Sequence, residues 1–335
     1  MGDKLAEFYS NFSQGKTYLA GEEAPEQGAW GDERQIYLED MSTGLFQVIC
    51  SYCRPITILN PLRFWRFLVF LISITSMMLS GYRSGMFNLI MIFFVASYFQ
   101  KRAVKDFVQL GFLTVPAIVF LLAMQGILPS LPLSAQRALS FLPGNWNRDA
   151  MVESAASTDW RKDMWKEVLA SNKYIANRNL GDGFGMTQQQ FDIIQHSSGG
   201  DIENYMVTGD FHSGPLTTIR VVGYVGLVLY YLLMIYMVMM AARIIRKSTD
   251  TPFFAAAIFI GVPIICFPIG FTFIFGAFNW SFPGSIVSLG LLRLLGNSID
   301  DYLEERRKVE KSQKVQEFRP ALGRAPIGVE VIPIG

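Results

Sequence analysis

Long apolar segments constrain this chain more than any other feature of its sequence. A helix that crosses the hydrocarbon core of a bilayer needs about 20 mostly apolar residues. Segments of that length, or close to it, occur at residues 64–80, 86–100, 107–128, 219–245, 253–278 and 282–299. Only 17% of the 335 residues are charged, against about 25% in an ordinary soluble domain. We therefore expect an all-α polytopic membrane protein with about six transmembrane helices.

Basic residues between these segments orient them in the membrane. One cluster precedes the first segment, one joins the second to the third, one joins the fourth to the fifth, and one follows the sixth. Because Lys and Arg concentrate in cytoplasmic loops, all four clusters fit the cytoplasmic side of a six-pass chain. Three segments are then extracytoplasmic: residues 80–86, residues 129–218 and residues 276–284.

The same pattern divides the chain into five parts. Residues 1–60 are a polar N-terminal segment that we expect in the cytoplasm. Residues 61–128 and residues 219–299 each hold three of the expected transmembrane helices. Residues 129–218 form an extracytoplasmic, largely helical loop domain, and residues 300–335 form a cytoplasmic tail that is partly disordered.

A glycine-rich motif, LGDGFGM at residues 180–186, resembles a phosphate-binding loop only superficially. No strand and helix of a βαβ unit surround it, so loop geometry accounts better for Gly181, Gly183 and Gly185. No Walker loop and no carboxylate-rich cluster is evident in the sequence. We therefore expect no cofactor, no nucleotide and no metal ion. The net charge of +1 gives no reason to expect nucleic acid as a partner.

Two residues lie at the outer ends of predicted membrane helices. Arg83, in SGYRSG, lies at the outward, positive end of the second segment. An arginine on the side that the positive-inside rule disfavours is a candidate functional residue. His212 lies directly ahead of the fourth segment, with Pro215 in the expected first turn. The positive end of that helix favours the neutral imidazole, which is the form that can accept a proton.

A third candidate lies in the loop domain. Residues 157–172 predict a helix, with Ser157 or Thr158 as its N-cap and apolar residues at helical spacing. Arg161 then falls in the first turn of this helix, where free N–H groups attract anions.

Each of these residues also has an ordinary structural explanation. Arg83 could be a turn residue that reaches lipid headgroups, and Arg161 a surface arginine paired with Asp159 or Asp163. His212 could be bonded to a backbone carbonyl. Together, however, the three would converge at the outer membrane surface. Arginine matches phosphate oxygens bidentately, and a neutral histidine can accept a proton from a hydroxyl, so the set suits a pyrophosphate-bearing lipid.

The order of the motifs resembles the O-antigen ligase and O-antigen polymerase superfamily of membrane glycosyltransferases. SGYRSG follows a membrane helix, RKDMW lies in the long outer loop, LGDGFGM comes next, and DFHSGPLTTIRVVGYVG opens the fourth segment. Members of the family have a similar SGxRxG turn, an R-x-x-x-W helix, a GxGxG loop, and a histidine ahead of a helix. The resemblance covers roughly residues 64–245.

The resemblance implies a metal- and nucleotide-independent glycosyltransferase in the bacterial inner membrane that acts in cell-surface polysaccharide biosynthesis. Its donor would be a glycan linked to undecaprenyl diphosphate or a similar polyprenyl-diphosphate carrier. Its acceptor would be a lipid or glycan hydroxyl on the periplasmic face. The resemblance assigns diphosphate binding to Arg83 and Arg161, and activation of the acceptor hydroxyl to His212. Other implied partners are membrane lipids and a partner membrane subunit.

Two alternatives to this hypothesis remain open within the same family. One is a protein O-oligosaccharyltransferase, which differs only in its acceptor. The other is a non-catalytic, degenerate or split membrane subunit of a polysaccharide assembly or export system. This second alternative follows from the six expected passes, where the family usually has ten or more, and from Ser213, where the family motif often has asparagine. Outside the family, a small-solute transporter with Arg83 as a substrate anchor is a third hypothesis.

Overall fold

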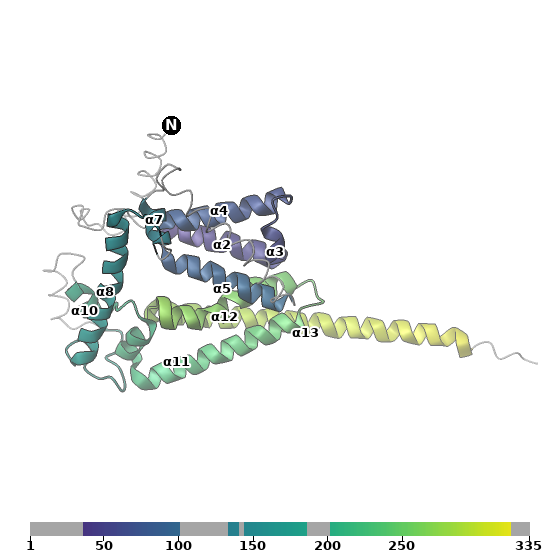
Figure 1. Cartoon of the computed structure of the whole chain (residues 1–335). Helices are drawn as coiled ribbons and strands as arrows, with labels where there is room; N and C mark the ends of the chain where they lie inside the picture. Colours follow the sequence, from purple (N-terminus) through teal and green to yellow (C-terminus); the bar gives the residue numbers. More distant parts are fainter. Residues whose placement is uncertain (1–35, 101–132, 141–143, 186–201, 323–335) are drawn as a thin grey trace, which may run out of the picture.

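The computed structural model describes residues 36–100, 133–140, 144–185 and 202–322. This part of the chain is helical and contains no strand, as expected of an all-α protein. In chain order its helices are α2 (Ile36–Tyr52), α3 (Pro55–Ile58), α4 (Phe64–Ser80), α5 (Arg83–Phe99), α7 (Leu133–Leu139), α8 (Arg148–Ala170), α10 (Ile202–Thr208), α11 (Gly214–Lys247), α12 (Phe254–Ile269), the π-helix η2 (Gly270–Ile274) and α13 (Phe278–Leu322) (Figure 1).

Three of the described helices are long and apolar enough to cross a membrane. They are α11, α12 continued by η2 as Phe254–Ile274, and the part of α13 that covers Phe278–Gln313. These correspond to the predicted fourth, fifth and sixth passes. Helices α4 and α5, at the first and second predicted passes, are apolar but have 17 residues each. The predicted third pass, residues 107–128, lies outside the described residues. The described helices thus indicate a membrane protein, and the count of six passes stays a prediction.

Helix α2 is an element that the sequence analysis did not predict. It lies within residues 1–60, yet it runs beside α5 from one end to the other. A side chain at Gly85, near the start of α5, would contact the carboxylate of Glu39 near the start of α2. At the other end, the Gln100 amide donates a hydrogen bond to the Cys50 carbonyl at 3.0 Å. The two helices are therefore parallel and cover the same length of the bundle.

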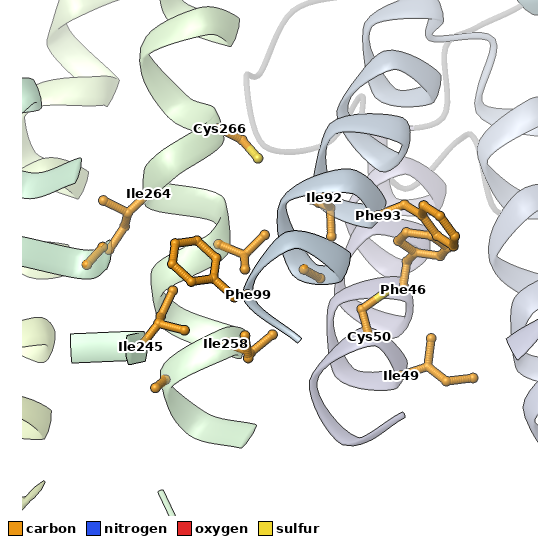
Figure 2. Close-up of a cluster of buried hydrophobic side chains, with 14 of the residues drawn as sticks. Phe46, Ile49, Cys50, Ile92, Phe93, Phe99, Ile245, Ile258, Ile264 and Cys266 are labelled. Carbon is orange, nitrogen blue, oxygen red and sulfur yellow. The ribbon is translucent and has the colours of Figure 1, made fainter. Parts of the chain in front are cut away.

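The largest hydrophobic core joins α2 and α5 to α11, α12 and α13. Figure 2 shows side chains of α5 between those of α2 and α12. The labelled residues are Phe46, Ile49 and Cys50 of α2, Ile92, Phe93 and Phe99 of α5, Ile245 of α11, and Ile258, Ile264 and Cys266 of α12. On its other side α2 packs closely on α4, where the Ser42 hydroxyl donates to the Ser73 carbonyl at 2.6 Å. Small residues and such hydrogen bonds favour close helix packing in lipid.

The position of α2 leads to a prediction about the membrane topology. If α5 crosses the bilayer, α2 is expected to cross it beside α5, with Tyr37 on the outer side and Asn60 in the cytoplasm. Both residues are exposed. In a cysteine-free background, Tyr37→Cys should react with a membrane-impermeant maleimide in intact spheroplasts, and Asn60→Cys only after the cells are opened. Protection of both cysteines in intact spheroplasts would instead agree with a cytoplasmic location for all of residues 1–60.

Short helices cover one end of the bundle. Helix α7 packs against α4, α5 and α8, and α8 packs against α10. In Figure 1 these three helices lie at the left end of the bundle, where α5 and α11 begin. This is the end to which the predicted topology assigns the extracytoplasmic loop domain, and His212 lies there, between α10 and α11.

Candidate functional site

His212 occupies a strained position directly ahead of α11. Pro215 lies in the first turn of this helix, as the sequence predicted, and Ser213 is its N-cap. Among the described residues, His212 is the non-glycine residue with a positive φ, at 48°. A left-handed backbone at such a residue costs of order 1–3 kcal/mol and persists only where the surroundings enforce it.

The ring of His212 is held by one carboxylate and three aromatic rings. Its Nδ1 atom lies 3.1 Å from Oδ1 of Asp210. The rings of Trp160 in α8, Tyr205 in α10 and Phe275 just after η2 lie with centroids 5.5, 5.2 and 5.2 Å from the imidazole centroid. The side chain of His212 is 20% exposed, so it is enclosed but still reachable. A carboxylate that accepts from Nδ1–H selects the tautomer in which Nε2 carries the lone pair.

The contacts with His212 favour the ionised form of the Asp210 carboxyl. Its burial acts to raise the pKa, but the hydrogen bonds from the ring and backbone of His212, together with the charge of that ring, outweigh burial. The pKa of Asp210 therefore lies below its usual value of 3.8. A carboxylate that stays ionised can orient the imidazole at neutral pH and stabilise the imidazolium that forms after proton transfer.

This pKa shift predicts a pH-dependent loss of stability. Because the folded-state pKa of Asp210 is depressed, its contribution to the free energy of unfolding is present above the unfolded-state pKa and is lost as the pH falls through the folded-state pKa. The melting temperature of the detergent-solubilised protein should therefore fall more for wild type than for Asp210→Asn between about pH 5 and about pH 3. Asp163→Asn, at an exposed pair with Lys166, is the control and should follow the wild type. Equal falls for wild type and Asp210→Asn would contradict the prediction.

The loop that carries His212 is fixed by its neighbour Phe211. The Phe211 ring is fully buried in a cluster with Met164 and Val168 of α8. Its carbonyl accepts a hydrogen bond from the Trp165 indole N–H at 2.7 Å. The indole N–H therefore holds the histidine loop against α8.

Arg220 fixes the same loop from the other side. This arginine lies in α11 and is buried. Its guanidinium donates to the carbonyls of Thr208 at 2.7 Å and Val207 at 3.1 Å, which are the last residues of α10. Gly209 has a φ of 76°, and a Cβ there would collide with the guanidinium. Arg220 thus satisfies carbonyls that would be orphaned at the end of α10.

The glycine-rich motif packs against a break in α11. Gly223, inside the helix, has φ 69° and ψ −174°, which are not helical values. At the break, the N–H of Asp182 donates to the Arg220 carbonyl at 2.6 Å, and that of Gly183 to the Val221 carbonyl at 3.0 Å. In return, the N–H of Tyr224 donates to the Arg178 carbonyl at 2.8 Å.

Loop geometry therefore accounts for two of the three glycines, as the sequence analysis proposed. Gly181 and Gly183 have φ values of 82° and 84°. A Cβ at Gly181 would collide with the carbonyl of Val221, so glycine is required there for close backbone approach as well. Gly185 has neither feature: its φ is not positive, and a Cβ would meet nothing within 4 Å.

Arg161 lies near the middle of α8, and the prediction of a first-turn position was wrong. The helix begins at Arg148, so Ser157 and Thr158 lie inside it rather than at its N-cap. Residues 148–156 include alanine, methionine and glutamate, which favour helix, and these extend α8 upstream. The attraction of anions to a helix N-terminus therefore does not apply to Arg161.

The two predicted arginines lie on different elements, α8 and α5, each of which packs near the end of the bundle that holds His212. Trp160, next to Arg161 in α8, contacts the imidazole ring, so this turn of α8 forms part of the site. Arg83 is the first residue of α5, as predicted, with Tyr82 as the N-cap. Helix α5 packs against η2, and η2 leads directly to Phe275, whose ring contacts His212. The three candidates thus belong to elements that meet at one end of the bundle.

Sequence reasoning missed several residues of the site. Asp210 and Arg220 both lie in the segment DFHSGPLTTIRVVGYVG that contains His212, but neither was predicted to be a site residue. An arginine within an otherwise apolar segment is the sequence signal that could have identified Arg220. The aromatic side chains of Tyr205 and Phe275 come from separate parts of the chain, and only the tertiary fold places them beside His212.

Comparisons of this chain with protein-family models, with curated proteins and with solved structures give no match.

Proposed function

We propose that the protein is a membrane glycosyltransferase of the O-antigen ligase or polymerase type. It transfers a glycan from a polyprenyl-diphosphate carrier to an acceptor hydroxyl on the periplasmic face of the bacterial inner membrane. The observation that carries the proposal is the pair formed by His212 and Asp210, enclosed by three aromatic rings at the start of a membrane helix. The resemblance of the motifs supports the choice of reaction.

His212 acts as the general base in this proposal. With Nδ1–H bonded to Asp210, Nε2 accepts the proton of the acceptor hydroxyl. The acceptor oxygen forms a bond to the anomeric carbon, and the bond from that carbon to the diphosphate oxygen breaks. The electron pair of the broken bond leaves with the polyprenyl diphosphate. Direct displacement of this kind inverts the configuration at the anomeric carbon.

Arg83 and Arg161 bind the diphosphate in the same proposal. Negative charge develops on the leaving group in the transition state, so positive charge there stabilises the transition state more than the ground state. Arg83 adds to the positive end of α5, where it is the first residue. Arg161 acts through its own charge, since it lies within α8 rather than at its N-terminus.

The aromatic rings beside His212 suit a sugar substrate. Trp160 and Tyr205 are half-buried and Phe275 is 49% exposed, so their rings are not sealed in a core. Flat aromatic faces offer apolar contact to the C–H faces of a sugar ring while its hydroxyls stay free for hydrogen bonds. This arrangement favours a glycan over a small ionic solute as the substrate.

The proposal is tested by deletion of the gene in its native host, followed by complementation with the wild-type gene. Surface glycan is read on gels, and the pool of lipid-linked glycan is measured on each membrane face. We expect the deletion to remove surface glycan while flipped, untransferred lipid-linked glycan accumulates. Loss of glycan from proteins alone would identify a protein O-oligosaccharyltransferase.

Other outcomes of the same experiment favour the alternatives. Lipid-linked glycan that stays on the cytoplasmic face would indicate a non-catalytic subunit of an export system. A deletion that changes neither surface glycan nor the lipid-linked pool would contradict a role in polysaccharide biosynthesis.

A further inference from the structure

Arg293 is a charged residue in the apolar part of α13. Leu291, Leu292, Leu294 and Leu295 surround it in the sequence. It lies in a helix long and apolar enough to cross a membrane, and its side chain is exposed. Within the described part of the chain, it forms no hydrogen bond or ion pair. Arginine that faces hydrocarbon is costly, so intramembrane arginines almost always face protein or pair with an opposite charge.

Contacts farther along α13 set the depth of Arg293. Asp300 pairs with Lys247 at the end of α11, and Arg306 donates to the Asp250 carbonyl at 3.4 Å. These contacts mark the cytoplasmic end of the bundle in the predicted topology. Arg293 lies about 10 Å deeper than Asp300 along the helix axis, at a rise of about 1.5 Å per residue.

The direction of the side chain disfavours an escape to the cytoplasmic headgroups. In an α-helix, side chains lean toward the N-terminus. The N-terminus of α13 is its outer end in the predicted topology, so Arg293 leans deeper into the bilayer. A lipid phosphate of the cytoplasmic leaflet is therefore poorly placed to neutralise it.

The flank of α13 around Arg293 is suited to a second helix. Gly290 and Asn297 lie three residues before and four residues after Arg293, and therefore on the same side. Both are exposed, and a Cβ at Gly290 would meet nothing within 4 Å. Leu292 and Ile299, on another face, are fully buried within the bundle. Small and polar residues are enriched where membrane helices approach each other.

We propose that this flank, defined by Gly290, Arg293 and Asn297, binds a membrane-spanning helix of a partner protein that carries an Asp or Glu opposite Arg293. The carboxylate neutralises the guanidinium where the dielectric constant is low and the attraction is strong. Gly290 permits close approach of the partner backbone, and the Asn297 amide supplies a further hydrogen bond. Binding of such a helix does not require the proposed glycosyltransferase activity.

Photo-crosslinking of the full-length chain in native membranes tests the proposal. A diazirine amino acid replaces Leu294, which is 66% exposed beside Arg293, and the matched control carries it at Leu232 of α11, which is 56% exposed. We expect a discrete adduct from position 294 alone, and its crosslinked peptide should belong to a membrane-spanning helix with an Asp or Glu. Arg293→Lys should keep the adduct, and Arg293→Leu should reduce it at least tenfold.

Two further measurements check that the variants fold and that Arg293 pairs with the acidic residue of the partner helix. Arg293→Leu makes α13 more apolar, so membrane levels of the variant should match wild type. Arg293→Glu should also lose the adduct, and replacement of the captured acidic residue by arginine should restore it. Four results would overturn the proposal: no adduct, an adduct to lipid, an adduct to residues 101–132 of this same chain, or a captured helix without an acidic residue.

Discussion

Replacement of His212 by glycine is expected to abolish glycan transfer without loss of folded protein. Removal of a general base costs about 10² to 10⁴ in rate, so transfer should fall by at least about a hundredfold and, with the acceptor unpositioned, by about a thousandfold or more. The backbone at this position has a φ of 48°, which glycine adopts without strain. Glycine therefore separates the chemistry of the imidazole from the shape of the loop.

The measurement is transfer from lipid-linked donor to acceptor by purified variants at equal concentration, with the melting temperature as the measure of folding. His212→Ala should lose activity to the same degree but melt at a lower temperature, because alanine is strained at a positive φ. Asp210→Asn should reduce transfer by an intermediate factor, since Nε2 remains but loses its oriented partner.

A His212 variant that retains transfer activity would be equally informative. If His212→Gly transfers glycan at the wild-type rate, the imidazole serves only as a turn residue and the general-base role is wrong. If His212→Gly is inactive but His212→Asn is active, then a hydrogen bond from the side chain, rather than proton transfer, is required.

The second large effect is expected at Gly223. A Cβ at this position would collide with the carbonyl of Asn179, and the φ of 69° is unfavourable for any side chain. The backbone strain and the overlap together should destabilise Gly223→Ala by about 2–5 kcal/mol. That is a large fraction of the stability of an ordinary domain, so the yield of monodisperse protein in detergent should fall sharply.

Gly284→Ala is the matched control for this effect. Gly284 lies in α13, where a Cβ would meet nothing within 4 Å and the φ is not positive. Its replacement should leave the yield and the melting temperature near wild type, or raise them slightly. A Gly223→Ala variant that melts like Gly284→Ala would mean that α11 continues as a regular helix through this point.

The sequence predicted the positions of the apolar helices better than it predicted the helices that pack beside them. Hydropathy identified the positions of α4, α5, α11, α12 and α13 because each of these helices contains a continuous apolar stretch that is visible in the sequence alone. Helix α2 was missed because Glu39 and Asp40 near its start lower its hydropathy. The residues that join it to the bundle, such as Phe46 and Ile49, are few and are recognisable only from their packing.

The candidate site was predicted only in part, because some of its features leave a local pattern in the sequence and others depend on tertiary folding. His212 and Arg83 were placed correctly at the starts of α11 and α5, since cap and breaker residues mark helix ends locally. The start of α8 was misplaced, because Ser157 and Thr158 resemble an N-cap but lie inside a longer helix. The contacts of His212 with Trp160 and Phe275 depend on tertiary folding and leave no local pattern.

The break at Gly223 separates α11 into a short segment next to the histidine loop and a longer apolar segment. The 34 residues of this helix exceed what one bilayer crossing requires. Residues 224–247 alone are long enough, at about 1.5 Å each, to cover roughly 30 Å of hydrocarbon. The segment before the break, which carries Arg220, is then free to lie at the level of the headgroups. At that level the guanidinium would bind the carbonyls at the end of α10 without the cost of a charge in hydrocarbon. The histidine loop would then be held by a part of α11 that the break at Gly223 separates from the spanning part.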